Sequence, residues 1–155
     1  MDYKKIFFTT SLIGTLYSYS AVILDYINFY KIAGTVFTLK YGLLPNPVVT
    51  PCFWGAFAFL LCAIITYKFL KADKTDLTKF KYFILFVVAS CTFALSNLSL
   101  EFKKFFEAGG KQYIGCSGQT VSNPFLTPCF GGSFIFVILL LVTSYSFRKI
   151  KKINV

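Results

Sequence analysis

Hydrophobic positions along this chain fall into four long runs without a charged residue, and the charged positions lie between them. The runs are Ile6–Leu24, Pro51–Tyr67, Tyr82–Leu100 and Pro128–Phe147. A helix needs about 20 apolar residues to cross the hydrocarbon core of a bilayer, and each run is close to that length. The pattern predicts an all-α polytopic membrane protein, a four-helix transmembrane bundle that forms a single domain over residues 1–155.

Basic residues are distributed unevenly between the runs, and this predicts an orientation. Eleven of the sixteen lysines and arginines lie before the first run, between the second and third, or after the fourth. The positive-inside rule therefore places both termini and the middle connection, which includes Lys74, in the cytoplasm of a multi-pass cell-membrane protein. The net charge of +10 follows from this topology and from lipid headgroups, and we expect no nucleic-acid partner, since no basic and aromatic binding platform is present.

A short pattern, N-P-x-x-T-P-C-F-x-G-x-F, occurs at residues 46–57 and again at residues 123–134. We call each copy the cassette. Each cassette leads from a turn into a hydrophobic run, so the same unit of helix, outer loop, cassette and helix is expected twice, over residues 1–70 and 79–149. Each unit crosses the membrane twice, so the two units point the same way. We expect them to be parallel repeats related by an axis along the membrane normal.

The residues of the cassette are typical of a helix start. Thr50 and Thr127 are predicted N-caps, because a threonine hydroxyl can accept a hydrogen bond from a free amide of the first turn. The proline that follows each threonine suits the first helical position, where no amide is needed. Cys52 and Cys129 are then second in their helices and face the outer side of the membrane.

Two further expectations concern packing. Gly55 and Gly132, one turn into their helices, are expected to permit close backbone approach. The first and third runs hold more serine, threonine and asparagine than the second and fourth. We therefore expect the first and third helices at the centre of the bundle, where hydroxyls bond between or within helices.

Three of the five cysteines, Cys52, Cys116 and Cys129, are predicted at the outer face. An oxidising outer face favours disulfides, and at least two of the three are expected to have Cα atoms about 4.4–6.8 Å apart. A thiol in the first turn lies near the positive end of the helix dipole, which favours the thiolate, the nucleophile of thiol–disulfide exchange. Cys52 and Cys129 are the candidate exchanging pair and Cys116 the candidate resolving thiol, whereas Cys62 and Cys91 are expected to be core residues.

The two helix starts, Thr50-Pro51-Cys52 and Thr127-Pro128-Cys129, resemble the proline-cysteine helix starts of the CcdA/DsbD electron-transfer membrane proteins. The resemblance is confined to these tripeptides, because those proteins have more helices and inverted repeats. The four-helix size is similar to that of the DsbB and vitamin K epoxide reductase proteins, but their C-x-x-C motif is absent from this chain.

Asp25 and Glu101 form a second repeated pair, each near the end of an outward-running helix. An acid at that position meets the negative end of the helix dipole, at a cost of about 0.3–1 kcal/mol. One hypothesis is that nearby lysines, Lys31, Lys103 or Lys104, form salt bridges with these acids. The other is a cation or proton site at the outer mouth of the bundle.

Two classes of function stay open at this point, and so does the question of enzymatic activity. The first is thiol–disulfide exchange at the outer face, with a redox partner protein or a quinone as partner in addition to the lipid bilayer. The second is a non-enzymatic membrane subunit or small transporter, in which the outer cysteines form a structural disulfide, Cys52–Cys129 or Cys116–Cys129. The chain has no histidine and no Walker, Rossmann or zinc-binding spacing, so the sequence indicates no metal site. It names neither a cofactor nor an oligomeric state.

Overall fold

Four long helices make up most of the protein. The computed structural model describes residues 3–42, 44–72 and 76–153, and Lys74 lies outside them. The helices are α1 (Tyr3–Ala33), α2 (Pro51–Lys71), α3 (Leu77–Glu107) and α4 (Pro128–Ile153). Each is long and apolar enough to cross a membrane, which confirms the predicted all-α four-helix fold of a multi-pass membrane protein.

Helices α1 and α3 are longer than their hydrophobic runs. Each has 31 residues, which is about 46 Å of helix against a hydrocarbon core of about 30 Å. Both continue for about two turns beyond the predicted ends at Leu24 and Leu100. Asp25 and Glu101 therefore lie inside helices rather than in a last turn, and the dipole cost expected for them does not apply, since it falls off within that turn.

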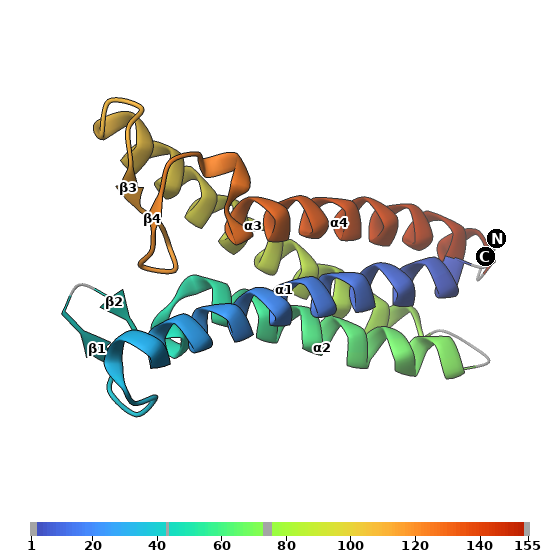
Figure 1. Ribbon diagram of the computed structural model, residues 1–155. Coiled ribbons are helices and arrows are strands. Elements are labelled where there is room, and N and C mark those ends of the chain that lie inside the picture. Colours follow the sequence, from blue (N-terminus) through green and yellow to red (C-terminus); the bar gives the residue numbers. More distant parts are fainter. Residues whose placement is uncertain (1–2, 43, 73–75, 154–155) are drawn as a thin grey trace.

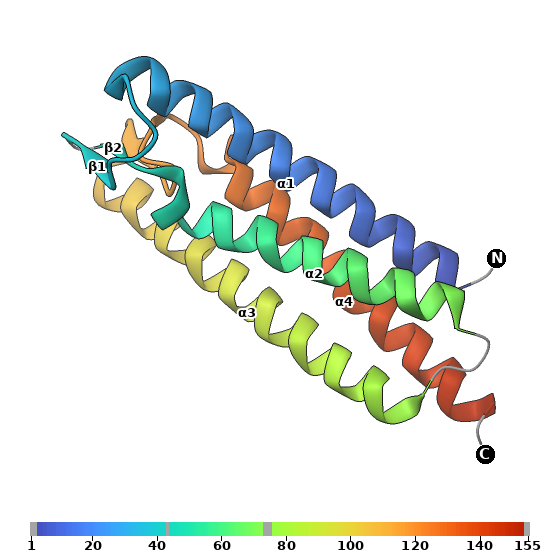
Figure 2. The same ribbon diagram turned by 90° about the horizontal axis from the view of Figure 1, so that it is seen from below.

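The helices form a four-sided bundle in which α1, α2, α3 and α4 follow one another around the ring. The hairpin pairs α1–α2 and α3–α4 pack most extensively, and α1 also packs closely on α4, whereas α2 and α3 touch over a smaller area. The start of α1, the end of α2, the start of α3 and the end of α4 lie together at one end of the bundle (Figures 1 and 2). This lysine-rich end contains Lys68, Lys71, Lys79, Lys81, Arg148 and Lys149.

The opposite end contains two small β-hairpins, one in each long loop (Figure 1). Strand β1 (Lys40–Tyr41) pairs antiparallel with β2 (Leu44–Pro45), and β3 (Tyr113–Ile114) pairs antiparallel with β4 (Thr120–Val121). We call this end of the molecule the hairpin end. It is the end at which α2 and α4 begin, so both cassettes lie there.

Each cassette folds into a short 3-10 helix followed directly by the long helix. The 3-10 helices are η1 (Pro47–Val49) and η2 (Pro124–Leu126). The side chains of Asn46 and Asn123 accept hydrogen bonds from the backbone N–H two residues later, at 3.1 and 3.0 Å. The asparagine thus caps the 3-10 turn, and the proline after it has no amide that would need a partner.

The core is built mainly from phenylalanine rings, and α2 and α4 meet at its centre. Phe59 of α2 and Phe136 of α4 stack with ring centroids 3.7 Å apart, and both are almost fully buried. The expectation that α1 and α3 lie at the centre is wrong. Several of their hydroxyls bond within their own helices, as where Thr15 donates to the carbonyl of Ser11 at 2.8 Å and Ser90 to that of Phe86 at 2.9 Å, whereas the buried Ser11 hydroxyl has no partner in the described part of the chain.

Close helix contact occurs at different glycines from those expected. A Cβ atom added to Gly131 of α4 would overlap the hydroxyl of Tyr17 of α1, whose ring would have to move, and one added to Gly14 of α1 would overlap the buried ring of Phe59 of α2. Gly55 and Gly132 face open space instead. The prediction that these two glycines permit close approach is therefore wrong; they line a pocket described below.

Candidate functional site

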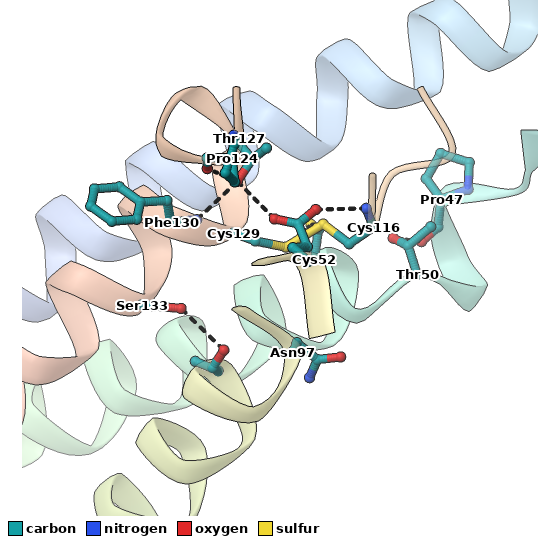
Figure 3. Close-up of a disulfide and its surroundings, with 12 residues drawn as sticks. Pro47, Thr50, Cys52, Asn97, Cys116, Pro124, Thr127, Cys129, Phe130 and Ser133 are labelled. Atoms are coloured by element: carbon teal, nitrogen blue, oxygen red, sulfur yellow. Dashed lines mark hydrogen bonds between the residues drawn. A yellow bond between two sulfur atoms is a disulfide. The ribbon is translucent and has the colours of Figure 1, made fainter. Parts of the chain in front are cut away.

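The sulfur atoms of Cys52, Cys116 and Cys129 meet at the hairpin end of the bundle (Figure 3). Cys116 and Cys129 form a disulfide. The Cys52 sulfur lies 3.0 Å from that of Cys116 and 3.1 Å from that of Cys129, and all three sulfurs are within 4.8 Å of one another. The structure therefore brings the three predicted site cysteines together. The bonded pair has a Cα separation of 7.3 Å, wider than expected from the sequence.

Three separate segments supply these cysteines. Cys52 and Cys129 are second in α2 and α4, as the cassette predicts. Cys116 lies in the tight turn between β3 and β4, where Gly118 takes a left-handed φ of 79° that favours glycine. The other two cysteines, Cys62 and Cys91, are unpaired and buried, in agreement with their predicted core role.

Glu101 of α3 connects two of the segments that carry the cysteines. Its side chain is 2% exposed. Oε1 accepts a hydrogen bond from the backbone N–H of Cys116, and Oε2 accepts one from the Thr127 hydroxyl, each at 2.8 Å. Among the described residues no lysine forms a salt bridge with Glu101, and Lys103 pairs with Glu107 instead, at 3.7 Å. Glu101 is therefore a positioning residue for the cysteine-bearing hairpin and for the start of α4.

Asp25 of α1 also reaches the second hairpin. It is 8% exposed, and Oδ1 accepts a hydrogen bond from the side-chain amide of Gln119 at 2.9 Å. Its other oxygen, Oδ2, has no hydrogen-bond partner within the described part of the chain. Lys31 lines the same pocket as Asp25, yet no salt bridge joins the two in the residues that the structure describes. The lysine hypothesis for these acids is thus not supported by the described contacts.

The two threonines of the cassettes differ in what they bind. Thr127 caps α4, because its hydroxyl oxygen accepts from the N–H of Phe130 at 3.3 Å. Thr50 occupies the N-cap position of α2 but makes no capping bond; its hydroxyl donates to the carbonyl of Pro47 at 2.7 Å. The capping prediction is confirmed for Thr127 and wrong for Thr50.

Two buried acids belong to the surroundings of the sulfurs: Glu101 binds the backbone of Cys116, and Asp25 binds Gln119 of the same hairpin. Their negative charge opposes a thiolate there, which is opposite in sign to the helix dipole that we expected to favour one. Burial and the charge of Glu101 raise the pKa of Tyr113, which lies in β3. Its phenol therefore stays protonated at neutral pH, and its hydroxyl has no partner among the described residues.

An apolar pocket lies beside the sulfurs, between the four helices. Its lining includes Cys52, Cys129 and the two glycines Gly55 and Gly132, with the stacked phenylalanines at its inner end. Asn97 and Ser133 are among its few polar lining residues, and the Ser133 hydroxyl donates to the carbonyl of Ala94 at 3.1 Å. The pocket was not predicted from the sequence, because it depends on how α2 and α3 separate.

Comparisons with protein-family models, with curated proteins and with solved structures find no match for this chain. The fold and the cysteine cluster describe a four-helix membrane protein that has three cysteines gathered at one end.

Proposed function

We propose that this protein carries out thiol–disulfide exchange at the hairpin end of the bundle. The observation that carries the proposal is the position of the Cys52 sulfur, 3.0 and 3.1 Å from the two sulfurs of the Cys116–Cys129 disulfide. Exchange requires a third sulfur that can attack a disulfide sulfur directly. A free thiol held beside both sulfurs of a disulfide meets that requirement.

The internal step can be written for these three residues. Cys52 gives up its proton, and its sulfur bonds to the sulfur of Cys129. The Cys116–Cys129 bond breaks, and Cys116 leaves with the electron pair and takes up a proton. The oxidation state of the protein is unchanged. The disulfide now joins the starts of α2 and α4, and the free thiol is on the β3–β4 hairpin.

A redox partner completes the function. Cys52 and Cys116 are both half-buried, but Cys116 is the one on the β3–β4 hairpin, so we expect a partner protein to meet it first. Two partner thiols would be oxidised to a disulfide while the disulfide of this chain is reduced to two thiols, with two electrons and two protons transferred. In the reverse direction a quinone is the candidate acceptor: two thiols of the chain would form a disulfide as the quinone becomes a quinol.

The structural alternative has support from the same bond. The Cys116–Cys129 disulfide joins the β3–β4 hairpin to the start of α4, and this is what a bond that only holds the loop would do. In that case the chain is a non-enzymatic membrane subunit or a small transporter. Cys52 would then be a bystander, and its removal would leave the chemistry of the disulfide unchanged.

The proposal includes an orientation and an internal symmetry. We infer that the lysine-rich end faces the cytoplasm and that the hairpin end faces the opposite side of the cell membrane. We also infer a duplication with a two-fold axis along the bundle. Its support is that equivalent cassette positions touch each other at two depths, Cys52 with Cys129 and Phe59 with Phe136. Equivalent residues meet only where they lie next to such an axis.

Comparing two cysteine variants tests the proposal. The rate at which dithiothreitol reduces the disulfide is followed in purified protein by mass tagging of the freed thiols. If Cys52 relays the exchange, Cys52→Ala slows this reduction by at least about tenfold, that is by about 1.4 kcal/mol in the barrier. Cys62→Ala, which removes a buried thiol away from the cluster, leaves the rate unchanged.

A second variant tests the same step through the disulfide that forms and needs no rate measurement. In Cys116→Ser the two helix-start cysteines remain, and oxidation should join Cys52 to Cys129, detected by peptide mapping without reductant. If that disulfide does not form and Cys52→Ala reduces as fast as the wild type, the structural alternative replaces the exchange proposal.

A further inference from the structure

We propose that the three-thiol form of this protein binds one soft metal ion through Cys52, Cys116 and Cys129. The proposal does not rest on thiol–disulfide exchange, because it concerns only the reduced state of the same cluster. The first observation is that three sulfurs from α2, α4 and the β3–β4 hairpin all lie within 4.8 Å of one another.

The sulfur positions fit ligands of a single ion. A zinc–thiolate bond of about 2.3 Å places sulfurs of one tetrahedral site about 3.8 Å apart. Cys52 now lies 3.0 and 3.1 Å from the other two sulfurs, so small side-chain movements after reduction of the disulfide are enough to accommodate an ion. The Cα atoms of Cys116 and Cys129 are 7.3 Å apart, above the usual disulfide range of about 4.4–6.8 Å. Two cysteines bridged by an ion have a wider limit, because their sulfurs lie about 3.8 Å apart instead of being bonded to each other.

Hydrogen bonds to Glu101 hold the ligand-bearing segments independently of the disulfide. Glu101 accepts from the backbone N–H of Cys116 and from the Thr127 hydroxyl next to Cys129, both at 2.8 Å. Reduction of the Cys116–Cys129 bond leaves these two contacts in place. The hairpin therefore keeps Cys116 over the helix starts, and the site is already assembled when an ion arrives.

The charge around the sulfurs favours a cation. Glu101 accepts a hydrogen bond from the backbone N–H of Cys116, and Asp25 accepts one from Gln119 of the same hairpin; both acids are more than nine-tenths buried. Within the described residues neither has a salt-bridge partner, and Asp25 Oδ2 has no hydrogen-bond partner at all. Buried negative charge without a compensating cation is costly, and an ion at the sulfurs would supply that compensation.

The ligand type selects the class of ion. Thiolates prefer soft or borderline cations with a filled d shell, such as Zn²⁺, Cd²⁺ and Cu⁺, over Mg²⁺ or Ca²⁺. Three protein ligands leave a fourth position open, which is typical of sites that exchange a ligand rather than of closed structural sites. A dithiol reductant gives two electrons and two protons to the Cys116–Cys129 disulfide and itself becomes a disulfide, and binding of the ion then displaces the thiol protons. The disulfide and metal-bound forms exclude each other.

Titration with Cd²⁺ alone tests this proposal. Protein in detergent is reduced, the reductant is removed without oxygen, and the thiolate-to-cadmium absorption in the ultraviolet is followed. We expect saturation at one ion per chain in the reduced protein and no such absorption in the disulfide form. We expect binding to weaken by at least about tenfold in each of three variants, Cys52→Ser, Cys116→Ser and Cys129→Ser. Loss of a residue that only supports a metal ligand already costs about tenfold or more in affinity, and these residues are the ligands themselves. Cys62→Ala should bind as the wild type does.

Protection of the cysteines from alkylation shows which of them bind the ion. Bound Cd²⁺ should shield the three cluster cysteines, and no others, from alkylation detected by mass spectrometry, and circular dichroism checks that each variant is folded. The proposal is overturned if the reduced and folded wild type, with its three thiols shown free by alkylation, gives no absorption. It is equally overturned if Cys52→Ser binds as tightly as the wild type. Metal binding is measured without the rate of disulfide reduction. The exchange proposal can therefore fail while the metal proposal holds, and the metal proposal can fail while the exchange proposal holds.

Discussion

The two cassettes have the same sequence pattern and the same local structure, but different surroundings. Each has an asparagine that caps a 3-10 helix and a cysteine in the first turn of a long helix. In the second cassette Thr127 bonds to Glu101 and Cys129 is joined to Cys116. In the first cassette the Thr50 hydroxyl bonds only within its own turn.

The loops above the cassettes account for this difference. The β3–β4 hairpin carries a cysteine and folds over both helix starts, whereas the β1–β2 hairpin has none. The Gln119 side chain on the second loop even reaches Asp25, which belongs to the first half of the chain. A repeated local pattern therefore fixes where each thiol sits. A single cysteine, Cys116, present in only one of the two loops, decides which thiols are bonded and which one is free.

The largest difference between the halves should appear when their buried acids are neutralised. In Glu101→Gln the amide can no longer accept from both the Cys116 N–H and the Thr127 hydroxyl, so we expect the free energy of unfolding to fall by about 1.5–3 kcal/mol, the value of hydrogen bonds to a charged group. In Asp25→Asn the remaining oxygen still accepts from Gln119 and an unpartnered charged oxygen is lost.

We therefore expect Asp25→Asn to change the free energy of unfolding by less than about 0.5 kcal/mol or to increase it. Unfolding of both variants in the same detergent, followed by circular dichroism, provides the comparison. An equal fall in the free energy of unfolding in the two variants would show that Asp25 and Glu101 are equivalent, and would contradict the difference between the two halves.

A smaller effect is expected at the neighbouring glycines of α4. Gly131→Ala places a methyl group against the Tyr17 hydroxyl and should destabilise the protein by about 1–3 kcal/mol through overpacking. Gly132→Ala meets open space and should raise stability by up to about 1 kcal/mol, because alanine favours a helix over glycine. Thermal unfolding in detergent distinguishes the two. A tolerated Gly131→Ala would contradict the close packing of α1 on α4.

The smallest effect concerns the threonines before each proline. Thr127→Ala removes the cap of α4 and a partner of Glu101, and should cost about 0.5–2 kcal/mol. Thr50→Ala should cost less, because α2 is not capped by that hydroxyl and the Pro47 carbonyl keeps its bond from the Thr50 N–H at 3.0 Å. Paired denaturant titrations measure the difference between the variants. If Thr50→Ala is as costly as Thr127→Ala, capping does not distinguish the cassettes.

Much of the fold could be predicted because it depends on local sequence. Charge-free runs of bilayer length identify membrane helices, and Thr-Pro before a cysteine identifies its helix start, so the placements of Cys52 and Cys129 were correct. The packing could not be predicted in this way. Gly131 meets another helix because α1 approaches α4 closely, and Gly55 does not meet one. Nothing in the local sequence distinguishes the two glycines in this respect.

The environment of the acids was also beyond the sequence pattern. Asp25 and Glu101 were identified as a pair, but their partners are loop residues such as Gln119, whose position is set by a hairpin that has no periodic signal. The same holds for Cys116. Its sequence position allowed a bond to Cys129, whereas its contact with Cys52 depends on where the hairpin folds.

The stacked rings of Phe59 and Phe136 are a barrier between the sulfurs at the hairpin end and the rest of the bundle. They pack at the centre of the bundle and line the cysteine pocket, and the only buried charged side chains in the described chain are Asp25 and Glu101. If the proposed exchange takes place, we expect a proton released from a thiol to equilibrate with water at the hairpin end. Chemistry of that kind would move no charge across the bilayer, so the transmembrane voltage, which acts only on charge that crosses it, would neither drive nor oppose it.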